Sequence, residues 1–182
     1  QGGLGVTTIN QNSDRNFDFL VVGPPRTATT WLSKNLNAHP RVFLPLDEAN
    51  YFTTNQPKGM FWYSQLFANA GDVDFVGENS STYFVSRDAC ERFKVDNPNA
   101  KVIVTLRDPL DRAISHYQLM WLNGQISPKT TFRRFCEDFE GHPLDPVKTG
   151  QYAQNLSTLY EVFGKLNVIV FFMEDIKDDP QV

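Results

Sequence analysis

The chain has 182 residues, of which 41% are hydrophobic and 13% aromatic, and its formal net charge is −4. This length fits one domain with a core of its own, and this composition excludes a disordered or collagen-like chain. The negative charge argues against a surface that binds nucleic acid, although it allows a local basic pocket for one small anion.

Expected strands and helices alternate along the first half of the chain. Residues 1–16 are polar and rich in Gly and Asn, which predicts a flexible N-terminal arm or the remnant of a tag. We expect strands at 17–22, 41–44 and 74–78, helices at 29–36, 60–70 and 86–95, and a turn at 47–52. Threonine hydroxyls are expected to cap the first helix. The aromatic residues at 51–52 and 61–63 are expected to pack in the core or to line a binding pocket.

The second half continues this alternation and indicates the fold class. The clearest buried strand is the β-branched run at 101–106, and a last strand is expected at 167–172. Helices are expected at 110–122, opened by Pro109, at 131–139, capped by Thr130 or Thr131, and at 151–163. Apolar strands that alternate with helices indicate an α/β fold, in which helices cover both faces of a parallel sheet.

One turn between an expected strand and an expected helix carries residues suited to an anion. It reads Gly23-Pro24-Pro25-Arg26-Thr27-Ala28-Thr29-Thr30-Trp31. Such a turn directs backbone N–H groups and a helix N-terminus toward one point, where an anion binds. Arg26 adds a forked cation, and Thr27, Thr29 and Thr30 add hydroxyl donors. The turn therefore indicates a site for a phosphate-like or sulfate-like group, with an ordinary strand-to-helix turn as the alternative.

A second motif follows the strand at 101–106. It reads Arg107-Asp108-Pro109-Leu110-Asp111-Arg112-Ala113-Ile114-Ser115-His116. Arg107 at the strand end and Ser115 on the next helix can together hold a second anion. The alternative is that the intervening aspartates pair with Arg112 and cap the helix, and His116 is expected to have no chemical role. Because ligands of parallel sheets bind at the carboxyl ends of strands, we expect both motifs at one rim.

The two motifs together resemble those of sulfotransferases that use 3′-phosphoadenosine 5′-phosphosulfate (PAPS). In that family a strand–loop–helix of the form Gly-x-Pro-Lys/Arg-Ser/Thr-Gly-Thr-Thr-x-Leu holds the 5′-phosphosulfate, and a later Arg-x-Pro-x-x-Arg-x-x-Ser segment holds the 3′-phosphate. Both patterns occur here in the same order, so the resemblance implies a P-loop-like sheet that binds PAPS and releases adenosine 3′,5′-bisphosphate (PAP). The nucleotide-binding residues that it implies are Pro25, Arg26, Thr27, Ala28, Thr29, Thr30, Trp31, Arg107 and Ser115.

Other segments resemble the carbohydrate-type and bacterial branch of the family. Residues 48–52, 77–83 and 150–156 resemble its Lys-Glu-x-x-Phe-Phe, Gly-Glu-Lys-Ser-Pro-x-Tyr and Gly-x-Tyr-x-x-x-Leu segments. The likeness implies Glu48 as general base and Arg26 as the group that stabilises the leaving phosphate, with no metal required. It implies a sulfotransferase domain over 17–182 that lacks the C-terminal portion of other members. Ala28 departs from the glycine that is usual at its position.

The resemblance implies transfer of a sulfuryl group to an acceptor hydroxyl on a small molecule, a lipid or polyketide, or a carbohydrate. Two alternatives stay open, a non-catalytic nucleotide-binding or scaffold domain and a nucleotide kinase of related fold. The first motif lacks the Gly-Lys-Ser/Thr that places lysine on phosphates and a hydroxyl on magnesium, which disfavours the kinase. No stretch reaches the length of a membrane span. A cytoplasmic location is favoured, with the Golgi lumen as the alternative if an N-terminal anchor was removed.

Overall fold

The computed structural model describes residues 16–178, in which five parallel strands form a central sheet. The strands are β1 (Phe19–Val22), β2 (Val42–Phe43), β3 (Phe75–Asn79), β4 (Lys101–Leu106) and β5 (Val168–Phe172). They lie in the order β2-β3-β1-β4-β5, and every neighbouring pair is parallel. The predicted α/β class is confirmed, and the carboxyl end of β1 lies between those of β3 and β4.

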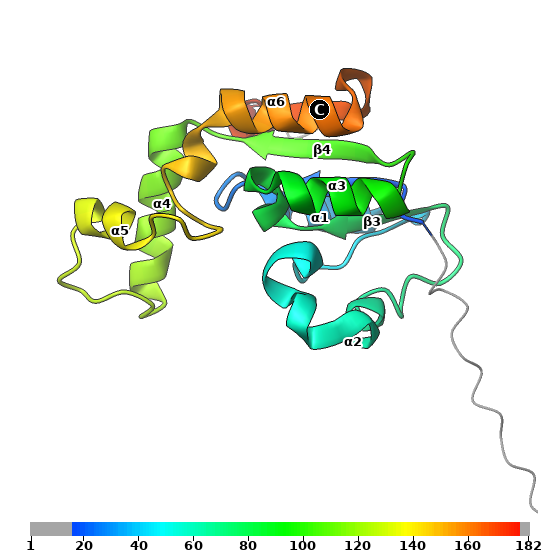
Figure 1. The fold of residues 1–182 in the computed structure, drawn as a ribbon, viewed down its shortest axis with the longest axis horizontal. Helices are drawn as coiled ribbons and strands as arrows, with labels where there is room; N and C mark the ends of the chain where they lie inside the picture. Colours follow the sequence, from blue (N-terminus) through cyan, green and yellow to red (C-terminus); the bar gives the residue numbers. More distant parts are fainter. Residues whose placement is uncertain (1–15, 179–182) are drawn as a thin grey trace, which may run out of the picture.

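Helices cover both faces of the sheet (Figure 1). The α-helices are α1 (Thr29–Ala38), α2 (Gly59–Gln65), α3 (Arg87–Asp96), α4 (Pro109–Leu122), α5 (Phe132–Asp138), α6 (Tyr152–Phe163) and α7 (Met173–Asp178). Shorter helical turns are η2 (Tyr51–Asn55), η3 (Gln56–Lys58), η4 (Ser81–Val85), η5 (Lys148–Gly150) and η6 (Lys165–Asn167). Helices α3 and α6 lie side by side on one face, and α1 lies on the other. Helix α4 starts at the carboxyl end of β4 and carries α5 beside it (Figure 1).

Strand β1 contributes to both layers because its side chains alternate. Leu20 and Val22 pack into the cluster formed with α3 and α6, whereas Phe19 and Val21 pack on the α1 side. All four side chains are buried. Successive side chains of a strand point to opposite faces, so a continuous apolar run serves two layers of core at once.

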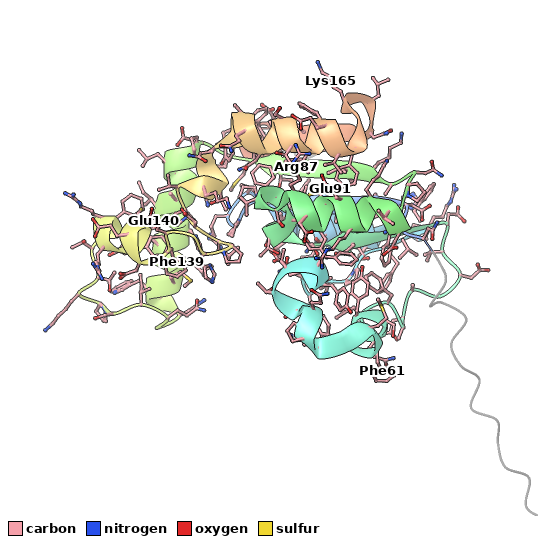
Figure 2. The ribbon with its side chains drawn as sticks, in the orientation of Figure 1. Phe61, Arg87, Glu91, Phe139, Glu140 and Lys165 are labelled. Carbon is pink, nitrogen blue, oxygen red and sulfur yellow. The ribbon has the colours of Figure 1, made fainter. Side chains whose placement is uncertain are left out.

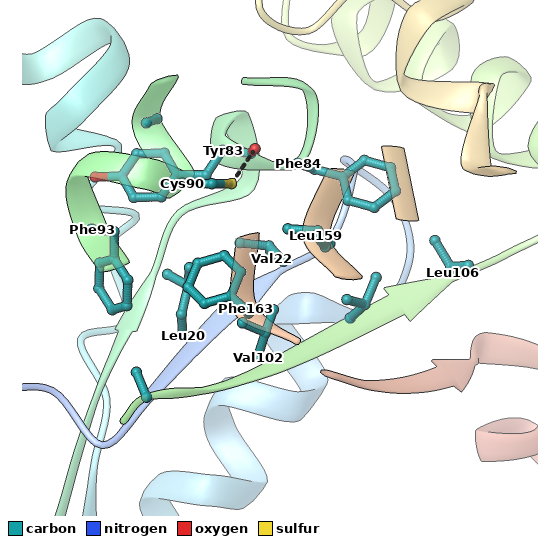
Figure 3. Packing of buried hydrophobic residues seen from close by; sticks show 13 residues of the cluster. Leu20, Val22, Tyr83, Phe84, Cys90, Phe93, Val102, Leu106, Leu159 and Phe163 are labelled. Atoms are coloured by element: carbon teal, nitrogen blue, oxygen red, sulfur yellow. Dashed lines mark hydrogen bonds between the residues drawn. The ribbon is translucent and has the colours of Figure 1, made fainter. Parts of the chain in front are cut away.

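The larger core lies between the sheet and the α3–α6 layer (Figure 3). It contains Cys90, whose thiol donates a hydrogen bond to the Tyr83 carbonyl at 3.2 Å. Burial raises the pKa of the Cys90 thiol to about 12. A thiol that stays protonated at physiological pH is a poor nucleophile, so Cys90 is a packing residue.

A second, aromatic cluster packs η2 against α2. The rings of Tyr51 and Tyr63 stack with centroids 4.4 Å apart, and Phe67 meets Tyr63 edge-on at 5.4 Å. Core packing therefore accounts for these buried rings. Phe61 is 78% exposed and extends from the outer side of α2 (Figure 2).

Most predicted elements are present, and the differences have local causes. Helix α2 ends at Gln65 rather than near residue 70, because tighter turns with bonds between residues three apart follow it and bury Phe67. Residues Tyr51–Asn55 form a π-helical turn where a plain turn was predicted, and α7 was not predicted at all. Thr131 caps α5 as predicted.

Two predictions concern the chain ends and membranes. The predicted N-terminal arm lies, apart from Asn16, outside the described residues. In the described part of the chain, no helix has both the length and the apolar character needed to cross a membrane.

His116 packs into the α4–α5 layer, and its ring lies 5.4 Å edge-on from that of Phe135. Burial, with the positive charges of Arg112 and Arg26, lowers its pKa to about 4. The unfolded chain binds this proton near the ordinary pKa of about 6.5. Because the folded state binds it only at lower pH, stability is expected to fall by about 3 kcal/mol as the pH drops from about 6.5 toward 4.

Urea unfolding of the wild type and His116→Leu at pH 7 and pH 4.5 tests this expectation. The variant should lose much less stability between the two pH values than the wild type, since it lacks the titrating ring. His142→Asn is the matched control, because His142 is exposed. If the wild type and His116→Leu lose the same stability between pH 7 and pH 4.5, groups other than His116 cause the loss.

Candidate functional site

The turn between β1 and α1 adopts an unusual backbone that suits an anion. Arg26 and Ala28 have φ angles of 75° and 72°, in the left-handed region that residues with a Cβ rarely enter. Alternating left- and right-handed residues turn successive N–H groups toward one side and form an anion-binding concavity. The turn is present with a backbone that suits an anion, and Ala28 adopts the conformation for which glycine is usual.

Helix α1 begins without a side-chain cap. Its N-cap is Ala28, and the predicted threonine cap is wrong. Thr27 cannot serve because its hydroxyl donates to the Pro24 carbonyl at 2.8 Å and lies 2.8 Å from the Thr105 hydroxyl. No hydrogen bond within the described residues uses the N–H groups of 28–31. This helix start therefore keeps its row of donors free for a ligand.

The remaining side chains of the turn differ in exposure. Thr27 and Thr29 are buried, Pro25 and Trp31 are half-buried, and Thr30 is exposed. The hydroxyl of Thr27 is directed inward, so this residue can meet an anion only through its backbone.

Gly23 leaves room for the buried threonines below the turn. A Cβ at this position would lie 2.4 Å from the hydroxyl of Thr105, 2.8 Å from Thr29 and 2.9 Å from the hydroxyl of Thr27. Gly23→Ala is therefore expected to destabilise the fold by about 1–3 kcal/mol, the usual cost of overpacking. Urea unfolding measures the loss. Gly150→Ala is the control, since its Cβ would meet only ordinary contacts from 3.6 Å outward; equal stability of the two variants would contradict the expectation.

The second motif meets the first at the predicted rim. Arg26 Nε donates to Ser115 Oγ at 2.9 Å, although 89 positions separate the two residues. The terminal guanidinium nitrogens of Arg26 have no partner among the described residues, and its side chain is exposed. One cation thus bridges the turn after β1 and the helix after β4, and it keeps donors available.

Arg107 lies at the end of β4 with 19% of its side chain exposed, and its Nη2 is 3.7 Å from Asp111 Oδ2. The Tyr152 hydroxyl donates to the Arg107 carbonyl at 2.9 Å and fixes the strand end. Asp108 caps α4 by accepting from two backbone N–H groups. The alternative prediction, in which the aspartates of this motif cap the helix and pair with Arg112, is thus correct for the cap. Its ion pair is wrong, because Asp111 faces Arg107 rather than Arg112.

Arg112 is a structural residue whose burial the sequence did not predict. It is fully buried, and its Nη2 donates to the Pro146 carbonyl. Burial lowers its pKa. Its Nε and Nη1 have no hydrogen-bond partner among the described residues, and the bond from Nη2 ties α4 to the segment before η5.

Glu48 lies in a polar network beside the carboxyl end of β3. Its Oε2 accepts from the Ser81 hydroxyl and, at 2.9 Å, from Asn50 Nδ2. The N–H of Ala49 donates to the Asn79 carbonyl at 2.8 Å, which fixes the Glu48 segment to the end of β3. Glu48 therefore sits at the same edge of the sheet as the two anion motifs, since β3 neighbours β1.

Glu78 lies behind this network and is fully buried. Its oxygens accept from the hydroxyls of Tyr63 and Ser80. Burial raises the pKa of this carboxyl group. A carboxyl group without contact to solvent suits a role in orienting its neighbours better than direct proton transfer.

Residues 16–182 match the family described as sulfotransferase domain. The chain belongs to the sulfotransferase family. Among curated sulfotransferases it is 39% identical over 181 residues to mouse bifunctional heparan sulfate N-deacetylase/N-sulfotransferase 4, covering 89% of this chain and 20% of that protein. It is 30% identical over 188 residues to human heparan sulfate glucosamine 3-O-sulfotransferase 6, covering 98% of this chain and 53% of that protein.

Solved sulfotransferase structures share the fold. The enzyme from Alicyclobacillus acidocaldarius superimposes with a TM-score of 0.80 at 23% identity over 91% of this chain and 76% of that one. Mouse sulfotransferase SULT7A1, complexed with PAP, superimposes with a TM-score of 0.57 at 19% identity over 91% of this chain and 55% of that one. This chain thus spans about a fifth to a half of the length of the two curated sulfotransferases compared above.

Proposed function

We propose that this chain transfers a sulfuryl group from PAPS to an acceptor hydroxyl. The observation that carries the proposal is the Arg26–Ser115 hydrogen bond, because it joins two anion motifs into one cradle beside the free N–H groups of 28–31. A nucleotide with phosphates at both its 5′ and 3′ positions presents two anions to such a cradle. Family membership and relatives named for sulfotransfer support the same reaction.

The residues of the turn fit the 5′ end of this nucleotide. Arg26 would stabilise the charge that grows on the leaving phosphate, and the N–H groups of 28–31 with the hydroxyls of Thr29 and Thr30 would surround it. Arg107 and Ser115 would hold the 3′-phosphate. When bound, PAPS supplies the sulfuryl group and a phosphate that departs with the electron pair of the broken S–O bond.

Glu48 would accept the proton of the acceptor hydroxyl as that oxygen bonds to sulfur. We propose a hydroxyl on a carbohydrate, a lipid or polyketide, or a small molecule. Relatives are named for heparan sulfate and for a curacin pathway. The net charge of −4 favours an acceptor less anionic than heparan sulfate. Cytoplasmic location and the absence of a metal from the reaction stay predictions.

Calorimetric titration with PAP, followed by transfer assays with ³⁵S-labelled PAPS and a panel of the three acceptor classes, tests the proposal. We expect that PAP binds and that the ³⁵S label appears on an acceptor. Addition of a metal chelator should not change the transfer rate. Binding without transfer to any acceptor would favour the scaffold domain. Phosphate transfer from ATP that requires magnesium would favour the kinase, and absence of PAP binding would remove the proposal.

A further inference from the structure

The amide of Asn50 has an orientation that its neighbours determine. The backbone N–H of Thr82 lies 3.1 Å from Asn50 Oδ1, and the Thr82 hydroxyl lies 2.8 Å from the same atom. A backbone N–H can only donate, so the Asn50 atom that faces it is the oxygen. The NH₂ group must then face Glu48, where Nδ2 lies 2.9 Å from Oε2.

The two oxygens of Glu48 differ in their surroundings. Oε2 accepts from two donors, Asn50 Nδ2 and the Ser81 hydroxyl. Within the described residues, Oε1 accepts no hydrogen bond and makes no ion pair. Both donors are aimed at one oxygen, which leaves the lone pairs of the other available for a ligand.

Asn50 itself is held on every side. Its φ of 43° is left-handed, a conformation that asparagine tolerates better than most residues. Its N–H donates to Ser80 Oγ at 2.8 Å, and the Ser80 hydroxyl donates to Glu78 at 2.6 Å. Its carbonyl accepts from N–H groups of η2. A residue fixed at its N–H, its carbonyl and its amide oxygen can hold a carboxylate in one place.

We propose that Asn50 and Ser81 are positioning residues that hold Oε2 of Glu48 so that Oε1 receives the proton of the acceptor. This inference rests on the proposed function. The proton moves from the acceptor hydroxyl to Oε1, the freed acceptor oxygen bonds to sulfur, and the S–O bond to the nucleotide phosphate breaks with its electron pair. Two donors on Oε2 stabilise the charged carboxylate, the form that is able to take the proton.

Other ionisable groups surround this network. Asp47 precedes Glu48 and is exposed, Tyr63 comes from α2, Glu78 from β3 and Tyr83 from η4. Burial raises the pKa of Tyr63, Tyr83 and Glu78. Among the described residues, none of these four groups bonds to Glu48, so removal of the Asn50 or Ser81 donor changes Glu48 most directly.

Separate measurement of kcat and of the acceptor KM for sulfuryl transfer, for wild type, Asn50→Gly and Ser81→Ala, tests the inference. Glycine keeps the left-handed backbone and removes only the side chain. With one donor lost, Oε2 is held less firmly and Oε1 is less often in place to receive the proton, so kcat should fall about tenfold. The acceptor KM and the affinity for PAP should stay within about twofold, because a positioned base acts in the transition state.

Asn55→Ala is the matched control in the same turn. Asn55 Nδ2 donates to the Ala49 carbonyl at 2.8 Å and makes no hydrogen bond to Glu48, so its loss should leave kcat unchanged. A wild-type kcat in both Asn50→Gly and Ser81→Ala would overturn the inference and leave the proposed function intact. A kcat that falls equally in Asn55→Ala would also overturn it. Absence of transfer by the wild type would instead remove the proposed function.

Discussion

Replacement of Arg26 by alanine is expected to reduce sulfuryl transfer at least about a hundredfold to a thousandfold, the usual effect of removing one preorganised donor from a developing anion. Arg26 is the cation of the turn after β1, and its Nε also binds Ser115 on α4. The variant therefore loses charge at the leaving phosphate and the link between the two motifs. PAP affinity should fall as well, because a ground-state contact is also lost.

Steady-state transfer assays and calorimetry with PAP measure both effects. Arg92→Ala is the control, since Arg92 is an exposed arginine that pairs with Asp88 on α3, away from the turn. Arg26→Lys should retain charge yet lose the fork that reaches Ser115 and a phosphate together, and so recover only part of the rate. Full activity in Arg26→Ala would show that another group stabilises the leaving phosphate.

The strands and the two motifs were predictable because both depend on local patterns. The β-branched run at 101–106 could only be a buried strand, and Pro109 marks the start of α4 as predicted. The parallel order brought the ends of β1 and β4 together, since these strands pair directly. Sequence reasoning therefore placed Arg26 and Ser115 at one rim without knowledge of the contact between them.

Other features of the site depend on packing across long sequence distances. The hydroxyl of Thr27 points inward because Thr105 of β4 and the Pro24 carbonyl engage it, which no local pattern indicates. The burial of Arg112 follows from the path of the chain near Pro146. The role of Asn50 depends on Thr82, which comes from η4. To predict each of these contacts, one must know how segments far apart in the sequence align in space. The local sequence pattern does not contain that information.

These observations also explain how the site combines rigid and free groups. The Thr27 hydroxyl faces the protein and is paired, whereas the N–H groups of 28–31 have no protein partner in the described residues. Glu48 repeats this arrangement, with Oε2 held and Oε1 open. Preorganised groups of this kind stabilise charge without the cost of reorienting during the reaction.

Glu48→Gln is expected to lower kcat about a hundredfold to ten-thousandfold, the range for loss of a positioned general base. The amide oxygen of glutamine can replace Oε2 and accept from Asn50 and Ser81, so the surrounding network stays satisfied. The NH₂ group then occupies the place of Oε1 and has no lone pair to take a proton. Folding stability and PAP affinity should therefore stay close to those of the wild type, within about twofold for affinity.

Single-turnover transfer assays and PAP calorimetry separate these quantities. Glu140→Gln is the control for a change of one carboxylate on the exposed surface (Figure 2), and its rate should equal that of the wild type. A normal rate in Glu48→Gln would assign the base to another residue. A rate that falls together with PAP affinity would instead mean that Glu48 shapes the nucleotide site, because a base that acts only on the acceptor proton leaves binding of PAP unchanged.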